Sequence, residues 1–349
     1  MNKPLRLANA TEIKQWDNLL GQNPYGAELY QTKSFAAIKQ VQGWKPQYWV
    51  YSTKSGAVYA LALIRKLPGL GRVVYIPRGP SVVEPKQWSE ICSINRQQLT
   101  DVIALKMEPP ILAGKLKVIR DDVKKVRDIQ GSVVNTVVIN LDQNEDTLWD
   151  SFRQRARRSI RGGRREQLKI SEGAFSPKNV DLLWGLYRET AARAGLKIRS
   201  KAYYENFWRE YTDRGQGRFF FAWTPDGKQP IAGLFVCYVG DKALYKDGGS
   251  RRDAKAHFSH LLQWETMRYL QQKGVRHYDL GGTPPTGKIN DSSHRLARLA
   301  TFKLSFGAPV TEHIGAYDQI LKPRLYEAWL FIERLHRAVA SHTKYRDLY

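Results

Sequence analysis

Cysteine and long apolar runs are both scarce in this chain. Its 349 residues include two cysteines, Cys92 and Cys237, and neither belongs to a CxxC pair. The seven histidines show no metal-ligand spacing, so the sequence excludes a disulfide framework and predicts no metal site. No run approaches the ~18 apolar residues of a membrane-spanning helix, and the first residues lack the apolar core of a signal peptide. We therefore expect a soluble, cytoplasmic protein.

Acidic residues are also few relative to basic ones. Asp and Glu number 33 against 56 Lys and Arg, which gives a net charge of +23. A field of that sign favours polyanions such as RNA, nucleotide diphosphates or an anionic membrane face. Hydrophobic residues make up 42% of the chain, with 10 Trp, 18 Tyr and 12 Phe. A core of that size excludes a disordered protein.

The two halves of the chain share one order of predicted elements. In the first half, hydrophobic periodicity predicts helices at 11–20, 34–43 and 86–107 and strands at 46–52, 57–64, 72–77 and 133–141. In the second half it predicts helices at 146–166, 178–194, 201–213, 258–272, 294–305 and 323–341, and strands at 218–223, 231–239, 242–248 and 276–280. Glycines and aromatics also correspond between the halves, for example Tyr75 with Tyr245. The sequence therefore predicts a repeated α/β unit.

Residues 153–165, RQRARRSIRGGRR, hold seven arginines in thirteen positions. The apolar residues beside them recur at every fourth position: Leu148, Phe152, Ala156 and Ile160. This spacing predicts one apolar stripe along a single helix, which Gly162-Gly163 would loosen or end. We therefore predict a packed helix with a basic outer face, because a disordered basic tail has no reason to carry an apolar stripe.

Short segments elsewhere contain residue types suited to binding phosphate or stabilising an oxyanion. They are Lys39 in YQTKSFAAIKQVQGW, Arg78 in IPRGPSV, Arg199 and Tyr203 in LKIRSKAYYENFW, Tyr245 in LYKDGGS, and Phe302-Lys303 in LATFKLSFG. At these residues the sequence resembles the FemABX family, the peptidoglycan aminoacyltransferases that use aminoacyl-tRNA. The most specific matches are the C-terminal FK-x-x-FG and the Arg-Gly-Pro at a strand end. The resemblance covers almost the whole chain and is greatest to compact, FemX-like members, since no long charged heptad arm interrupts the second half.

The resemblance implies an α/β (α+β) fold of two tandem GNAT-like (acyl-CoA N-acyltransferase-like) domains, each a mixed sheet flanked by helices. Domain 1 is expected at 1–145, completed by a C-terminal helix within 320–349. Domain 2, with the catalytic motif, is expected at 146–319.

The implied reaction transfers an amino acid from aminoacyl-tRNA to an amine on the stem peptide of a peptidoglycan precursor, forming an interpeptide bridge. Aminoacyl-tRNA is the co-substrate and no other cofactor is expected. The acceptor is UDP-linked or lipid-linked, and the sequence decides neither this nor the amino acid. A monomer with peripheral contact at the inner face of the cell membrane is expected.

Matched position by position, Lys39, Arg199 and Tyr203 resemble the family residues that hold the diphosphate-bearing precursor. Tyr245 is expected to line the precursor groove, and Arg78, between prolines at a strand end, is expected to bind substrate. An arginine fork can pair two phosphate oxygens, and lysine supplies a mobile point charge. The alternative is that the Lys and Arg residues are solvated surface charges, as most are.

Phe302-Lys303 matches the catalytic pair of the family. Lys303 is expected to stabilise the oxyanion that forms when an amine attacks the ester, an effect typically worth ~3 kcal/mol for one donor, and Phe302 to shape its pocket. Asp279 is a candidate base, against a purely structural role at a strand end.

Two further groups of residues lie on predicted helices. The exposed arginines Arg153, Arg157 and Arg161 are expected to contact tRNA or lipid phosphates. His257 and His260, three residues apart, are expected on a polar helix surface.

Two other functions fit parts of the sequence. One is a FemAB-like acyltransferase with an acyl-CoA or acyl-carrier donor in polysaccharide synthesis, although neither half contains the R/Q-x-x-G-x-G/A loop that grips the CoA pyrophosphate. The other is a non-catalytic RNA-binding protein that uses the arginine helix, which leaves Phe302-Lys303 and the Arg-Gly-Pro segment without a purpose.

Overall fold

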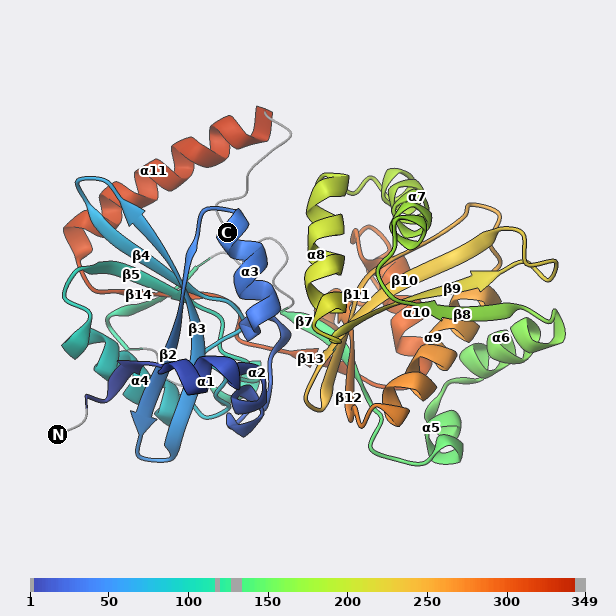
Figure 1. The fold of residues 1–349 in the computed structure, drawn as a ribbon, viewed down its shortest axis with the longest axis horizontal. Helices are drawn as coiled ribbons and strands as arrows, with labels where there is room; N and C mark the ends of the chain where they lie inside the picture. Colours follow the sequence, from blue (N-terminus) through green and yellow to red (C-terminus); the bar gives the residue numbers. More distant parts are fainter. Residues whose placement is uncertain (1–2, 117–119, 127–133, 343–349) are drawn as a thin grey trace. The chain divides into compact units, whose positions relative to one another are not determined.

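The computed structural model describes residues 3–116, 120–126 and 134–342 (Figure 1). It divides into two compact units: unit 1 comprises Met1–Val134 and Glu312–Tyr349, and unit 2 comprises Asn135–Thr311. These limits lie about ten residues before the boundaries expected from the sequence. The reason is strand pairing, since β7 (Asn135–Asn140) joins the sheet of unit 2 and β14 (Tyr317–Ile320) joins the sheet of unit 1.

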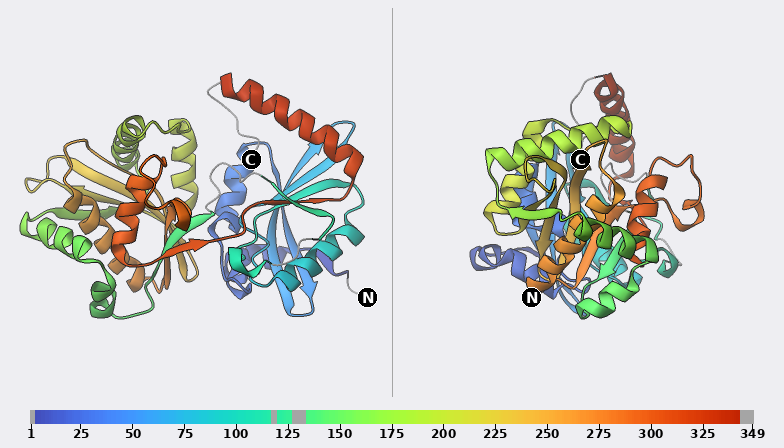
Figure 2. Two further views of the ribbon diagram at one scale, coloured as in Figure 1. Left: turned by 180° about the vertical axis from the view of Figure 1, so that it is seen from behind. Right: turned by 90° about the vertical axis from the view of Figure 1, so that its right-hand side faces the viewer.

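Unit 1 is built on a seven-stranded mixed sheet in the order β1-β2-β3-β4-β5-β14-β6. Its other strands are β1 (Leu5–Leu7), β2 (Lys45–Thr53), β3 (Gly56–Leu67), β4 (Gly71–Ile76), β5 (Val102–Met107) and β6 (Val123–Lys125). Its helices are α1 (Ala10–Lys14), α2 (Trp16–Leu19), α3 (Lys33–Val41), α4 (Pro85–Gln98) and α11 (Pro323–His342), with 3₁₀ turns η1 (Leu20–Gln22), η2 (Leu29–Gln31) and η3 (Ala113–Lys115). Helices α4 and α11 lie on opposite faces of this sheet (Figures 1 and 2), each over its own apolar cluster.

Unit 2 has a second seven-stranded mixed sheet, in the order β13-β7-β12-β11-β10-β9-β8. Its other strands are β8 (Lys169–Gly173), β9 (Gly217–Trp223), β10 (Pro230–Val239), β11 (Lys242–Ser250), β12 (His277–Gly282) and β13 (Val310–Glu312). Its helices are α5 (Glu145–Ser151), α6 (Gln154–Arg165), α7 (Pro177–Arg193), α8 (Lys201–Asp213), α9 (Ala256–Gln272) and α10 (Ala297–Lys303), with 3₁₀ turns η4 (Thr286–Lys288) and η5 (Leu304–Phe306). Helices α7 and α8 cover one face, and α6 and α9 the other.

The predicted repeat is confirmed. In unit 1, α3 is followed by β2, β3 and β4, then α4 and β5; in unit 2, α8 is followed by β9, β10 and β11, then α9 and β12. In both units the helix after the three antiparallel strands returns the chain to a parallel partner, β4 with β5 and β11 with β12. Tyr75 lies on β4 and Tyr245 on β11, as the correspondence required.

The predicted helix at 86–107 is wrong in its second part. Helix α4 ends at Gln98, and Val102–Met107 is the fully buried strand β5. A short apolar run is compatible with either a buried strand or a buried helix, and its periodicity does not distinguish them. The parallel pairing with β4 decides the conformation, and that contact is not visible in the local sequence.

The predicted single helix at 146–166 is two helices. Phe152 and Arg153 adopt extended backbone angles and separate α5 from α6. All four residues of the expected apolar stripe are buried, so the burial prediction is confirmed although the helix is interrupted. The break lets the backbone N–H of Arg153 donate to the carbonyl of Ser305 at 3.0 Å, which fixes the start of the arginine helix against η5.

The glycine pair in the arginine helix does not end it. Helix α6 continues to Arg165, and Gly163 is buried. A Cβ atom at Gly163 would lie 3.0 Å from a methyl carbon of Leu261 and 3.3 Å from the carbonyl of His257, both on α9. Glycine therefore favours the close approach of α6 to α9, because a larger residue would press on Leu261 and on the α9 backbone.

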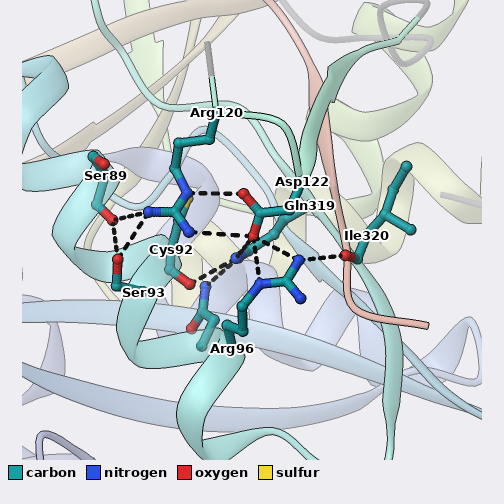
Figure 3. Close-up of polar contacts among 9 residues, drawn as sticks. Ser89, Cys92, Ser93, Arg96, Arg120, Asp122, Gln319 and Ile320 are labelled. Carbon is teal, nitrogen blue, oxygen red and sulfur yellow. Dashed lines mark hydrogen bonds and ion pairs between the residues drawn. The ribbon is translucent and has the colours of Figure 1, made fainter. Parts of the chain in front are cut away.

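The half-buried carboxylate of Asp122 joins three separate segments of unit 1 (Figure 3). Asp122 accepts hydrogen bonds from Arg120 (2.8 Å), Arg96 (2.9 Å) and the side-chain amide of Gln319 (3.0 Å). Gln319 also donates to the carbonyl of Cys92 at 2.6 Å. Burial alone would raise the pKa of Asp122, but these hydrogen bonds outweigh burial and lower it to about 2. The ionised form of Asp122 therefore holds α4, the turn before β6, and β14 together.

We predict that Asp122→Asn lowers the free energy of unfolding of unit 1 by about 2 kcal/mol at pH 7, because hydrogen bonds to an ionised group are worth ~1.5–3 kcal/mol. The folded-state pKa lies below the ordinary value of 3.8, so this stabilisation is complete above about pH 4 and is lost as the pH falls towards about 2. Urea unfolding at pH 7, 5 and 3.5 measures the difference.

The adjacent, exposed Asp121 provides the control. We expect Asp121→Asn to leave the unfolding free energy within about 0.5 kcal/mol of wild type. An Asp122→Asn loss no larger than that of Asp121→Asn would contradict the role of Asp122.

Candidate active site

Lys303, the last residue of α10, has a buried ammonium group. The residue is 6% exposed, and its Nζ donates to the carbonyl oxygen of Gly282, at the end of β12, at 2.8 Å. Burial lowers the pKa of Lys303 to about 8, and the nearby Asp279 carboxylate opposes this shift. A buried lysine with a lowered pKa beside backbone carbonyls is typical of a functional site.

The ammonium group lies where two parallel strands separate. Strands β11 and β12 pair from Lys242/His277 to Leu244/Asp279, and beyond that point both strands continue without pairing to each other. A Cβ atom on Gly281 would lie 3.6 Å from Lys303 Nζ and 3.6 Å from the carbonyl of Tyr245. Gly281 has a φ of 78°, which favours glycine. The chain thus brings Lys303 next to main-chain groups of both strands at their point of separation.

Asp279 is held by its own neighbours in the strand. Its Oδ1 accepts from the backbone N–H of Gly281 at 2.7 Å and from the hydroxyl of Thr136 on β7. These bonds account for the structural role that the sequence left as an alternative. Its carboxylate also favours the charged form of Lys303.

Phe302, which precedes Lys303, packs in an aromatic group with His260 and Phe306. The ring centroids lie 4.8 Å apart for His260 and Phe302 and 5.4 Å apart for Phe302 and Phe306. His260 Nε2 lies 3.0 Å from Ser305 Oγ, which donates to the carbonyl of Phe302 at 2.5 Å. These contacts link His260 to the turn at Phe302 through the Ser305 hydroxyl.

The expectation of a polar helix surface is wrong for His260. The residue is 2% exposed and supports the turn that carries Phe302 and Lys303. The four-residue spacing of Phe302 and Phe306 was a signal for this aromatic group, because such residues share a helical face. His257, in contrast, contacts the carboxylate of Glu166 at 2.8 Å.

Arg199 and Tyr203 contact each other at the start of α8. The Arg199 guanidinium carbon lies 4.5 Å from the centroid of the Tyr203 ring, and both residues are half-buried. Arg199 precedes the helix, and Ser200 caps the helix by accepting from the Tyr203 N–H at 3.3 Å. Because Arg199 lies before the first residue of α8, the two side chains do not share a helical face. A cation–π contact beside the helix cap joins them.

Lys246 and Asp247 on β11 connect this pair with Tyr245. Lys246 Nζ lies 3.2 Å from Asp247 Oδ1 and 4.7 Å from the ring centroid of Phe207, which packs against Tyr203. The buried Asp247 accepts from Trp208 Nε1 at 2.9 Å. The β10–β11 pairing shifts register between Phe235/Asp247 and Val236/Tyr245, at Lys246, and such bulges redirect side chains beside active sites. The sequence did not lead us to Lys246 or Asp247. A Lys-Asp pair inside a predicted strand was the feature that could have indicated them.

Tyr245 itself is half-buried against the core of unit 2. Burial, with a further contribution from Asp247, raises the pKa of its hydroxyl. The hydroxyl therefore stays protonated and can act as a hydrogen-bond donor. Unit 2 thus carries five of the predicted site residues. Arg199 and Tyr203 contact each other at the start of α8, Tyr245 on β11 packs against the core, and Phe302 and Lys303 end α10.

The other two predicted substrate residues, Lys39 and Arg78, lie in unit 1, and both are buried. Lys39 on α3 donates to Gln42 Oε1 at 3.0 Å. Arg78 follows β4 with a φ of 47°, and its Nε lies 3.5 Å from Glu28 Oε2. The alternative of solvated surface charges is wrong for both residues. Their role in binding a precursor stays a prediction.

The arginines of α6 differ in their surroundings. Arg157 lies 3.2 Å from Asp150, Arg161 stacks over the Trp149 ring at 5.5 Å, and the Arg153 side chain is exposed. These contacts place Arg157 and Arg161 beside α5. Contact with tRNA or lipid phosphates stays a prediction for all three.

Among the described residues, no group of His, Cys, Asp and Glu is arranged to hold a metal ion. No helix in the described ranges is both long enough and apolar enough to cross a bilayer.

Comparison with known proteins identifies the class of fold to which the two units belong. Residues 150–290 match the family model described as an acetyltransferase (GNAT) domain. A solved structure of FemX superposes with a TM-score of 0.76 at 18% identity, covering 94% of this chain and 99% of that chain. The fold therefore consists of two GNAT-like domains, the architecture of an acyltransferase.

Full-length relatives are also similar. The lipid II:glycine glycyltransferase of Staphylococcus epidermidis is 20% identical, covering 90% of this chain and 92% of that protein. The enzyme of the same name from Staphylococcus aureus is 21% identical over 90% of this chain and 93% of its own. These similarities extend over nearly the whole chain and support its resemblance to the FemABX family.

We predict that Asp279→Asn lowers the pKa of Lys303 below about 8, because the carboxylate favours the ammonium form. The amide keeps an oxygen to accept from Gly281, so the strand geometry is retained. NMR titration of ¹³C-labelled lysine Cε, assigned with Lys303→Met, measures the change. The control is Asp226→Asn in the β9–β10 turn. An unchanged or raised Lys303 pKa in Asp279→Asn would show that this carboxylate does not act on the ammonium.

Proposed function

We propose that this protein transfers an aminoacyl group from aminoacyl-tRNA to an amine on the stem peptide of a peptidoglycan precursor. The observation that carries the proposal is the buried ammonium of Lys303 at the separation of β11 and β12. The relatives that share nearly its full length are named as lipid II:glycine glycyltransferases. A lipid-linked acceptor and glycine are therefore the first substrates to test.

The acceptor amine attacks the ester carbonyl carbon, which gives a tetrahedral oxyanion. The C–O bond to the ribose of the tRNA then breaks, and the ribose hydroxyl leaves with a proton that derives from the amine. A lysine ammonium has three N–H donors, and Lys303 gives one of them to Gly282. We assign stabilisation of the oxyanion to this ammonium, since a fixed charge in a low-dielectric site needs no reorganisation during the reaction.

The half-buried group on α8 and β11 supports a binding role for anionic parts of the precursor. Arg199 is held by the Tyr203 ring, and Lys246 lies over Phe207 in the same group. Arginine held in one orientation is suited to two phosphate oxygens. We assign the diphosphate to this side of unit 2 and the reacting ester to Lys303.

The surroundings of α9 weigh against acyl-CoA as the donor. The start of the helix after the parallel-strand crossover is where a GNAT acetyltransferase grips pyrophosphate. In this chain, Lys255 at that helix start lies 3.1 Å from Glu166, and His257 lies 2.8 Å from the same carboxylate. A carboxylate at that position repels a pyrophosphate, so we favour aminoacyl-tRNA over acyl-CoA.

We expect wild-type protein to transfer a labelled amino acid from charged tRNA, and Lys303→Met to reduce kcat about 100-fold, since one oxyanion donor is worth ~3 kcal/mol. The assay offers pooled aminoacyl-tRNAs with UDP-linked and lipid-linked pentapeptide precursors, and mass spectrometry identifies the product. The matched control is Lys288→Met in η4, an exposed lysine. Transfer from acyl-CoA but from no aminoacyl-tRNA would overturn the proposed donor. Full activity in Lys303→Met would overturn the assigned role.

A further inference from the structure

The outer face of α11 exposes a cluster of large apolar side chains. Seven large hydrophobic residues of the described chain are strongly exposed, and three of them lie within five positions of α11. They are Phe331 at 61%, Ile332 at 39% and Leu335 at 52% exposure. The other four are single residues on separate elements, which is normal for a soluble protein. A cluster of this kind marks an interaction surface.

The packed face of α11 prevents these residues from turning inward. Tyr326 and Trp329 are buried against Val73 and Ala104 of the unit 1 sheet. The Tyr326 hydroxyl donates to the buried Asp318 at 2.8 Å. The packed residues recur at spacings of three and four, and the exposed ones recur likewise on the opposite side of the helix. The helix is therefore apolar on two faces and packs with only one.

The charges around the exposed cluster are mainly basic. Arg324 and Arg334 are exposed on α11, and Lys322 lies half-buried just before the helix. Glu327 is the exposed acid among the described residues of α11. The chain as a whole carries +23. Apolar side chains flanked by arginine and lysine are suited to an anionic lipid surface, where the chains enter the headgroup boundary and the cations remain at phosphate level.

We propose that the outer face of α11 docks on an anionic lipid bilayer, with Phe331, Ile332 and Leu335 inserted at the interface. This inference rests on the proposed function, because an acceptor linked to lipid has to be met at a membrane surface. Three side chains cover far less than the ~800 Å² that each partner of a stable protein complex contributes. A bilayer needs no such complementary area, so it is the occupant that this small, basic-flanked cluster fits.

The test measures binding of the full-length protein to vesicles without any substrate. Vesicles of phosphatidylglycerol and phosphatidylcholine, and of phosphatidylcholine alone, are sedimented with wild type and with the triple variant Phe331→Gln, Ile332→Gln and Leu335→Gln. We expect the triple variant to bind the anionic vesicles at least tenfold more weakly. Arg324→Gln with Arg334→Gln should weaken binding to anionic vesicles and remove most of its salt dependence, without changing binding to neutral ones.

The matched control replaces three equally exposed residues elsewhere: Leu7→Gln, Val41→Gln and Leu112→Gln, which are 59%, 78% and 44% exposed in wild type. The control variant should bind vesicles as wild type does, and circular dichroism confirms the fold of each variant. Equal vesicle binding by wild type and the α11 triple variant would overturn the proposal. A wild-type dimer in sedimentation velocity that the triple variant abolishes, with vesicle binding unchanged, would identify a second copy as the occupant instead.

Transfer assays separate failure of this inference from failure of the proposed function. On a soluble UDP-linked acceptor, the α11 triple variant should match wild type. On a lipid-linked acceptor in anionic vesicles, it should be at least tenfold slower. Absence of transfer by wild type on both acceptors would reject the proposed function, whereas the vesicle-binding result decides the α11 surface independently of activity.

Discussion

The separation of two parallel strands in unit 2 is the constraint on which the candidate active site depends. Beyond Leu244 and Asp279, β11 and β12 no longer pair with each other, although Gly282 of β12 still pairs with Thr136 of β7. The Lys303 ammonium meets the carbonyl of Gly282. The same cation that completes the strand geometry is available for an oxyanion.

The two units share an order of elements but differ at this point. In unit 1, β4 pairs with β5 along its whole length, from Arg72/Val102 to Ile76/Met107. Strand β14 then occupies the other edge of β5. No comparable separation exists between these two described strands, so the repeat supplies two similar scaffolds that differ at the position corresponding to the candidate active site. Duplication of a fold therefore does not imply duplication of its chemistry.

Most of the fold follows from local patterns in the sequence. Strands with continuous apolar runs, such as β9 and β10, and helices with serine N-caps, such as α7 and α8, were predicted close to their observed limits. Strand β5 was assigned to a helix because its conformation depends on pairing with a distant strand. For the site, Phe302 and Lys303 were found from a motif. His260 and Asp247 were missed because their burial arises from contacts between residues dozens of positions apart.

The path of the chain through the two sheets has a consequence for synthesis of the protein. Unit 2 is one continuous segment, whereas unit 1 needs β14, which follows unit 2 in the chain and lies between β5 and β6. About 190 residues separate the end of β6 from the start of β14, and until the ribosome has added them β5 has an open edge and Asp122 lacks Gln319. The nascent N-terminal sheet is thus incomplete, and its closure by the last strand joins the two ends of the polypeptide into one domain.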